Sequence, residues 1–142
     1  MDHVVYLDAK SDEMTKLLEG GKTMIIRGAA GRKMPYGRVN AGDVLYFLNN
    51  DGEGLVKARA LVQSVLNSEK MEKDQSSDLV AENQDQLQLT ERQFKRWAGK
   101  RYLVLISVSD LEEVAPFGVD RSDFGNMDDW LPVEEIEEVK MV

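Results

Sequence analysis

The sequence has 142 residues, of which 42% are hydrophobic and 31% charged, and its formal net charge is −8. This length and composition predict one globular domain and exclude a largely disordered chain. The absence of cysteine excludes disulfides, thiolate nucleophiles and sulfur-ligated metal sites. The negative net charge argues against nonspecific coating of nucleic acid, which needs an excess of positive charge.

The chain starts without a basic region followed by an apolar run, and no stretch approaches the roughly 18 apolar residues of a membrane span. We therefore expect no membrane partner and a cytoplasmic location.

The first forty residues predict two strands, one helix and a basic loop. A short strand is expected at 3–7, and a helix capped by Ser11 is expected to run to Leu18, before two glycines. A β-branched and apolar segment at 23–27 predicts the second strand, and the glycine-rich, basic segment 28–38 follows it as a loop.

A hairpin is expected next. The third strand covers 43–48, and Asn-Asn-Asp-Gly at 49–52 is typical of a tight turn leading into a fourth strand. In that strand Lys57 and Arg59 share one face, because alternate residues of a strand point the same way.

The middle of the chain turns polar. Residues 67–88 are expected to form a mobile insertion or exposed helices, least structured at 75–78. Thr90 and Gln93 have the spacing of a capping box, which predicts a helix running toward Trp97.

The most apolar strand is expected at 101–108, near the centre of the sheet. The tail from Asp110 contains prolines and glycines, so we expect turns and short strands there. Its aromatic residues Phe117, Phe124 and Trp130 are spaced as if to pack the tail onto the domain.

Positive charge is concentrated between residues 20 and 60, where seven Lys and Arg face three acidic residues. Arg27 would project beside the apolar Ile25 and bind two acceptors, while Lys22 would act as a mobile point charge. Glycine amides of the loop could surround an anion, and Tyr36 could stack on a base. The alternative is a solvated, unevenly charged surface. The candidate ligand-binding residues are Lys22, Arg27, Arg32, Lys33, Tyr36, Arg38, Lys57 and Arg59.

Other short motifs resemble known functional sites but lack the surrounding residues that those sites need. Gly-Lys-Thr at 21–23 resembles the end of a phosphate-binding loop but follows a helix instead of a strand, and Lys16 stands where a glycine is needed. The segment 120–129 lacks the glutamate that completes a calcium loop, and His3 has no second histidine for a metal site. No metal, cofactor or catalytic residue is therefore predicted.

One arrangement resembles a known family. Gly20, Lys22 and Arg27 follow a glycine-ended helix with the spacing G-x-K-x-x-x-x-R, and Gly-Asp at 42–43 precedes an apolar strand. In this order the features resemble an ASCH domain, best over residues 6–65. The ASCH family is similar to PUA domains.

This resemblance implies an α+β fold, a small curved PUA-like β-barrel with flanking helices. The chain would be a single ASCH/PUA-like domain over 1–142, with the polar insertion near 67–88 and a C-terminal extension from about 110. The similarity also implies that RNA, a nucleotide or a nucleoside binds in a basic cleft lined by the candidate residues.

Some ASCH proteins are amidohydrolases that act on acetylcytidine, and the resemblance would assign catalysis to a lysine, a threonine three residues later and a downstream glutamate. Lys22 matches the lysine, but Ile25 stands at the threonine position and has no hydroxyl. Glu82 and Glu91 are both candidates for the glutamate. Hydrolysis of an acylated nucleoside is thus the alternative function, and we favour binding alone.

A third hypothesis is a protein-interaction domain. The acidic run Glu134, Glu135, Glu137 and Glu138 could dock on a basic partner, although such runs are usually solvated faces.

Overall fold

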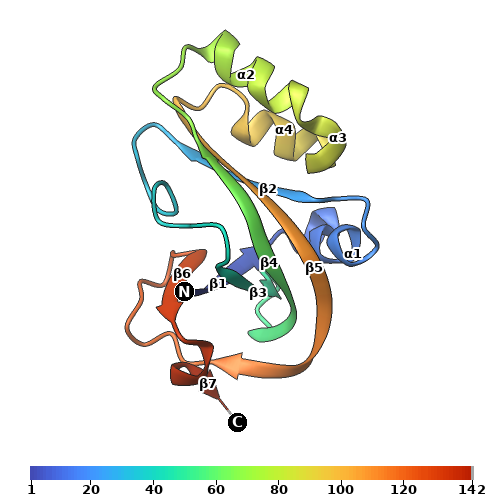
Figure 1. Cartoon of the computed structure of the whole chain (residues 1–142), viewed down its shortest axis with the longest axis vertical. Helices are drawn as coiled ribbons and strands as arrows, with labels where there is room; N and C mark the ends of the chain where they lie inside the picture. The colour runs from blue at the N-terminus through green and yellow to red at the C-terminus, as the bar shows by residue number, and fades with distance from the viewer. Residues whose placement is uncertain (142) are drawn as a thin grey trace.

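The computed structural model describes residues 1–141 (Figure 1). In chain order the elements are β1 (Asp2–Leu7), η1 (Ala9–Ser11), α1 (Glu13–Leu18), β2 (Met24–Ala29), β3 (Val44–Asn49), β4 (Leu55–Asn67), α2 (Lys73–Glu82), α3 (Gln84–Leu87), α4 (Glu91–Trp97), β5 (Tyr102–Val119), β6 (Trp130–Glu134), η2 (Ile136–Glu138) and β7 (Lys140–Met141). None of the helices within residues 1–141 is long and apolar enough to cross a membrane.

The described strands form one sheet in the order β2-β5-β4-β3-β1-β6, and β7 pairs with β5. β1 and β3 run parallel, and the other pairs are antiparallel. The long strands β4 and β5 bend across the molecule, so the sheet curls into a half-barrel (Figure 1). The predicted α+β class and curved sheet with flanking helices are confirmed.

Strand β2 separates two apolar cores. Ile25 packs inside the curl of the sheet with Phe47 and Ile106, whereas its neighbour Ile26 packs with Val80 and Trp97 under the helices. This follows from the alternation of side chains along a strand. Figure 1 shows α2, α3 and α4 together beyond β2, at the end of the molecule opposite β7.

Helix α4 begins as predicted. The side-chain oxygen of Thr90 accepts a hydrogen bond from Gln93 N, and the Gln93 side chain accepts one from Thr90 N at 3.0 Å. This capping box satisfies two N–H groups at the start of the helix. The last turn of α4 carries Lys95, Arg96 and Trp97.

The prediction for the first helix is wrong at its start. Ser11 lies in η1, and the N-cap of α1 is Asp12, whose φ of 52° is in the left-handed region. The Ser11 hydroxyl instead donates to Asp8 at 3.1 Å. A local polar contact therefore competes with the capping role that the sequence indicated.

The segment 75–78 was predicted to be the least structured part of the insertion, and this is also wrong. These residues lie within α2, which starts with a capping box between Glu72 and Gln75. Ser76 is fully buried and accepts a hydrogen bond from Gly99 N at 3.0 Å. Val80 then anchors the helix in the core under β2.

The tail also differs from the prediction. β5 does not end at Val108 but continues to Val119 through a left-handed residue, Asp110, with φ of 54°. Its second half pairs with β4 through several register shifts, so the strand bends there. Phe117 and Phe124 pack against a third apolar cluster, and Trp130 is buried in the core inside the curl, as expected for residues that fix the tail.

Candidate ligand-binding cleft

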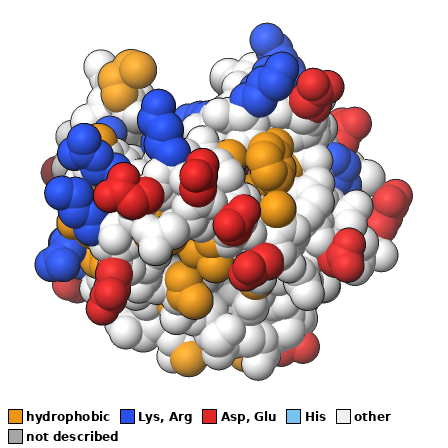
Figure 2. Space-filling view, turned by 90° about the horizontal axis from the view of Figure 1, so that it is seen from above, with side chains coloured by type: hydrophobic (Ala, Val, Ile, Leu, Met, Phe, Trp, Pro, Cys, Tyr) orange, Lys and Arg blue, Asp and Glu red, His pale blue; other side chains and the backbone are white. Residues whose placement is uncertain are grey.

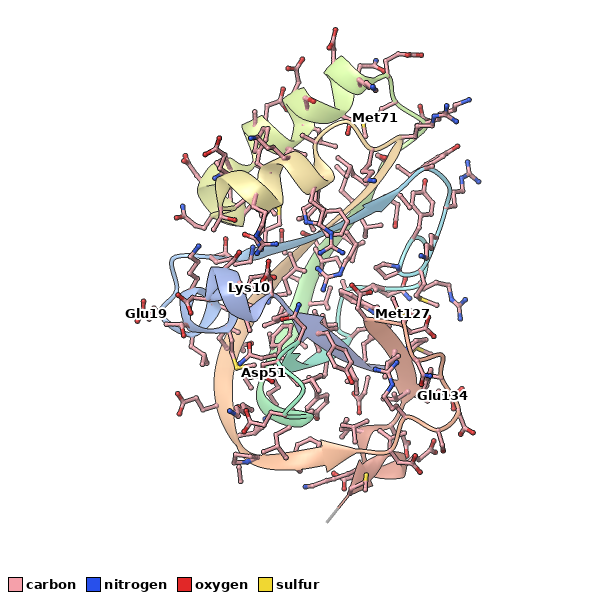
Figure 3. All side chains as sticks on the ribbon, turned by 180° about the vertical axis from the view of Figure 1, so that it is seen from behind. Lys10, Glu19, Asp51, Met71, Met127 and Glu134 are labelled. Carbon is pink, nitrogen blue, oxygen red and sulfur yellow. The ribbon has the colours of Figure 1, made fainter. Side chains whose placement is uncertain are left out.

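A cleft of about 360 Å³ lies where β1, β2 and α4 meet the loop between β5 and β6. Figure 3 views the molecule from behind, with Lys10 near α1 and Met127 near β6. The loop supplies Met127, whose side chain is 94% exposed, to the rim. The lining residues are Tyr6, Asp8, Glu13, Ile26, Arg27, Asn50, Leu89, Gln93, Arg96, Trp97, Arg121, Asn126, Met127, Asp128 and Asp129.

Arg27 is the buried cation of the cleft. Its Nη1 donates to the carbonyl of Ile26 at 2.8 Å, and its Nη2 donates to the carbonyl of Tyr6 at 2.7 Å. The guanidinium therefore links β2, at one end of the sheet, to β1. Its Nε is fully buried without a hydrogen-bond partner, and Asp129 Oδ2 lies 3.5 Å from it.

Two tryptophans flank this guanidinium. The Cζ atom of Arg27 lies 6.0 Å from the ring centroid of Trp97 and 5.6 Å from that of Trp130. These distances are typical of cation–π contacts. The sequence prediction that Arg27 projects beside apolar side chains pointed to Ile25, but its aromatic neighbours come from α4 and β6.

A second guanidinium lies on Trp97. The Cζ atom of Arg96 is 4.4 Å from the Trp97 ring centroid, and the Arg96 side chain is exposed. Salt bridges within residues 1–141 do not include Arg96. A guanidinium thus already lies over the indole, and Trp97 itself is buried, so the exposed Arg96 plane is the group on which a base could stack.

The cleft is not uniformly basic, which corrects the prediction of a basic cleft. Three arginines line it together with four carboxylates, those of Asp8, Glu13, Asp128 and Asp129. Burial would raise the pKa of Asp8, but hydrogen bonds from Arg92 and Ser11 hold it below its ordinary value. Asp8 therefore stays ionised at neutral pH. The lining is mixed in charge and contains both donors and acceptors.

Gln93 adds a free amide donor. Its Oε1 accepts from Thr90 N, but none of the hydrogen bonds of residues 1–141 uses its Nε2. Gln93 is among the residues that line the cleft, so its amide is available to a ligand there.

Lys22 lies behind the cleft instead of in it. Its side chain is 1% exposed, and its Nζ donates to the carbonyl of Leu87 at 2.5 Å and lies 3.5 Å from Glu13 Oε2. Burial lowers the pKa of Lys22 to about 8, against the attraction of Glu13. The prediction of a mobile point charge is wrong, because these contacts fix the ammonium between α1 and α3.

The basic loop is attached to the sheet. The Tyr36 hydroxyl donates to the carbonyl of Ser68, and the Tyr36 ring packs edge-to-face on Tyr102 at 5.6 Å. Arg32 lies over both rings, at 5.7 and 5.6 Å. One face of Tyr36 is therefore already in contact with a guanidinium.

The remaining loop cations point elsewhere. Lys33 lines a neighbouring hollow of about 250 Å³, which shares Met127, Asp128 and Asp129 with the cleft. Arg38 is exposed and lies outside the lining of both.

Lys57 and Arg59 do not line the cleft either. As predicted they share the exposed face of β4, where Lys57 contacts Glu53 at 2.8 Å and Arg59 contacts Glu112 at 3.1 Å. The structure therefore brings only Arg27, of the eight candidates, into the cleft.

Arg121 holds the loop that completes the cleft. Its Nη1 donates to the Tyr6 hydroxyl at 2.8 Å, and its Cζ lies 5.3 Å from the Tyr6 ring centroid. Its Nη2 donates to the carbonyls of Gly125 and Asp128. Sequence reasoning missed Arg121, since only the folded chain brings it beside β1. For Arg96 and Trp97 the sequence did contain a signal, since these consecutive residues place a cation beside an aromatic ring at the end of a predicted helix.

The residues considered for hydrolysis do not converge. Ile25 is fully buried in the core, and Glu82 and Glu91 are both exposed, with Glu91 3.5 Å from Lys95. Glu13 is the carboxylate beside Lys22. Residues 1–141 contain no cluster of His, Cys, Asp and Glu that could hold a metal ion.

Comparison with known proteins gives a fold. No model of a known protein family matches the chain, and no curated protein matches it. Three crystal structures of an ASCH protein from Zymomonas mobilis are similar over 96% of this chain. A tyrosine-to-phenylalanine mutant gives a TM-score of 0.71 at 15% identity and is covered over 93% of its length. The ASCH protein itself and a serine-to-alanine mutant each give 0.69 at 14% identity, over 91% of their length.

The chain has the ASCH fold. At this identity the similarity concerns the fold, and it confirms the resemblance that the glycine, lysine and arginine spacing indicated. Within the ASCH fold of this chain, the cleft lies at the meeting point of β1, β2, α4 and the C-terminal loop.

Proposed function

We propose that this chain is a PUA-like module that binds RNA or a nucleotide, with a base held in the cleft beside Trp97. One observation carries this proposal: an exposed guanidinium, that of Arg96, lies over the Trp97 ring at a cleft that also contains a buried N–H without a hydrogen-bond partner, that of Arg27 Nε. Stacking on aromatic rings and on guanidinium planes is how proteins hold unpaired bases.

The charges suggest how a nucleotide would be oriented. Phosphate deep in the cleft would meet four carboxylates, whereas a base is uncharged and carries carbonyl and ring-nitrogen acceptors. Gln93 Nε2 offers a donor to such an acceptor, and a shift of the half-exposed Asp129 would free Arg27 Nε. The phosphate would then lie at the rim, near Arg96.

The test is a binding titration with matched arginine variants. Short labelled single-stranded RNA and the four 5′-mononucleotides are titrated into wild type, Arg96→Ala and Arg59→Ala. Arg96→Ala should weaken binding about fivefold, because it removes a stacked cation from the cleft. Arg59 is also an exposed arginine but is paired with Glu112 outside the cleft, so Arg59→Ala should leave affinity unchanged. No binding even at low salt, or equal losses in both variants, would reject the proposal.

A second candidate is hydrolysis of an acylated base, favoured by the contact between Lys22 and Glu13. Because Lys22 is buried behind the cleft, Glu13, which lines the cleft, would be the group that meets the substrate, and Lys22, with its pKa lowered to about 8, would exchange a proton through Glu13. Incubation with a panel of acylated nucleosides, followed by chromatography, tests this: release of the carboxylic acid and the deacylated nucleoside that is lost in Glu13→Gln supports it, and absence of turnover rejects it.

A further inference from the structure

His3 is fully buried, and both of its ring nitrogens have partners. Nε2 lies 2.8 Å from Asp43 Oδ2, and Nδ1 lies 3.1 Å from the indole Nε1 of Trp130. An indole N–H can only donate, so Nδ1 must accept and the ring proton must sit on Nε2, where it is donated to Asp43. The site therefore requires neutral His3 in one tautomer.

These contacts form a chain that ends at the cleft. Asp43 also accepts from Asn40 N at 3.0 Å, which fixes its carboxylate. Trp130 packs edge-on against His3, with ring centroids 5.9 Å apart, and its ring lies 5.6 Å from Cζ of Arg27. The Arg27 guanidinium, which also donates to the carbonyls of Ile26 and Tyr6, thus lies against a ring whose own orientation is set by His3.

From this geometry we infer that His3 is a positioning residue for the cleft, acting through Trp130 to hold Arg27 for its ligand. The ligand part of the inference rests on the function proposed above. The positioning part does not, because it concerns only contacts among the protein's own side chains.

A second proton on the His3 ring would break its hydrogen bond with Trp130. It would sit on Nδ1, facing the indole N–H, and two donors cannot share a hydrogen bond. Trp130 would have to move, and Arg27 would lose one of its two aromatic neighbours. Asp43 and Asp2 favour the charged ring, while burial and the N-terminal ammonium oppose it, and burial prevails, so the pKa of His3 is lowered.

Two substitutions at His3 separate its contact with Asp43 from its contact with Trp130. His3→Asn keeps an amide oxygen near the position of Nδ1, which can accept from Trp130, but it cannot reach Asp43. His3→Gln can donate to Asp43 from its amide, but it leaves the indole N–H of Trp130 without an acceptor.

Nitrogen-15 NMR gives a readout that needs no ligand, because the chain has two tryptophans and hence two indole signals. In wild type the Trp130 signal should shift in one step as the pH falls below about 6.5, the ordinary pKa of histidine, while the Trp97 signal moves much less. In His3→Asn that step should disappear. At pH 7.5 the Trp130 signal of His3→Gln should differ from that of wild type, because the indole N–H loses its acceptor, and identical signals in the two folded proteins overturn the inference.

The ligand readout uses the 5′-mononucleotide bound best by wild type. His3→Gln should weaken its binding several-fold more than His3→Asn, and equal affinities would overturn the role of His3 in the cleft. If wild type binds no nucleotide, the proposed function fails, while the indole titration still decides the positioning role. Should either variant not fold, Trp130→Phe keeps an aromatic ring and removes the N–H. In wild type the Arg27 Nε–H signal should move as His3 is protonated; this response should disappear in Trp130→Phe, and an unchanged response overturns the inference.

Discussion

Lys22 and Arg27 are five residues apart on one segment, but burial and neighbours give them different roles. Arg27 reaches the cleft, where Trp97 and Trp130 flank it. Lys22 is enclosed between Glu13 and the Leu87 carbonyl. A loss of ligand binding after substitution of Lys22 would therefore report damage to the fold.

We expect Lys22→Met to destabilise the protein by about 3–5 kcal/mol, because it leaves Glu13 charged and unpaired in a buried position. Urea unfolding followed by circular dichroism measures this loss. The control is Lys57→Met, which removes a solvent-exposed ion pair with Glu53 and should change stability little. Equal effects of the two substitutions would contradict the structural role of Lys22.

His3 predicts a pH dependence of stability. Because burial makes the folded-state pKa of His3 lower than the unfolded value of about 6.5, the unfolded chain binds the proton more readily. The contribution of neutral His3 is complete above about pH 6.5 and is lost as the pH falls toward the folded-state pKa. Urea unfolding at pH 7.5 and pH 5 should show a larger loss in wild type than in His3→Asn. Parallel losses would show that His3 does not titrate on unfolding.

The residue types of the site were only partly predictable. The spacing of Lys22 and Arg27 indicated an ASCH-like segment, and Arg27 does line the cleft. The cleft residues Trp97, Arg121 and Asp129 come from 70 to 102 residues further along the chain, and only the folded sheet brings them to Arg27. The sequence also contained no sign that His3 contacts Asp43 and Trp130, since each contact joins segments that are far apart in the sequence.

At the scale of elements, β2 is held between two cores and tolerates little added volume. A Cβ atom at Gly28 would lie 2.7 Å from Leu103 Cδ2 and 3.1 Å from the carbonyl of Tyr102, both on the paired strand β5. The glycine is thus explained by close packing of β2 on β5, where the sequence suggested an approach to an anion.

Gly28→Ala should destabilise the protein by about 1–3 kcal/mol, the usual range for overpacking, because the backbone carbonyl of Tyr102 must shift. Thermal or urea unfolding measures the change. Gly31→Ala is the matched control, since a Cβ atom there meets nothing within 4 Å. An unchanged stability of Gly28→Ala would show that β2 and β5 are not packed this closely.

Elements defined by local chemistry were predicted well, and elements defined by pairing were not. The capping box of Thr90 and Gln93 placed α4 correctly, because a cap depends on residues three positions apart. The extension of β5 to Val119 depends on its ladder with β4 and β7, which no local pattern encodes. For residues 67–88 the sequence left a mobile insertion and exposed helices both open, because the polar composition of α2 hides its buried residues Ser76 and Val80.

At the scale of the molecule, charge is segregated despite the net value of −8. Figure 2 shows Lys and Arg side chains gathered along one edge and at the top of the view, with acidic side chains between them. The cleft lining is itself mixed in sign. Because positive and negative side chains alternate around the cleft, we expect a bound RNA to make only a few phosphate contacts there.

This arrangement predicts a shallow salt dependence for binding of single-stranded RNA. With one or two phosphates contacted, the logarithm of the affinity should fall with the logarithm of salt concentration with a slope of about −1. Fluorescence anisotropy of a labelled ten-nucleotide RNA between 50 and 200 mM salt measures it. A much steeper slope would indicate a broad electrostatic surface and contradict recognition through the cleft.

Occupation of the cleft by a base is tested most directly by nitrogen-15 NMR during titration with a 5′-mononucleotide. The Trp97 indole N–H and the Arg27 Nε–H signals should shift together and saturate, because both groups line the cleft. The backbone signals of Lys57 and Arg59 should stay in place. Saturable shifts confined to the face of β4 that carries Lys57 and Arg59, or no shifts at millimolar nucleotide, would contradict the account.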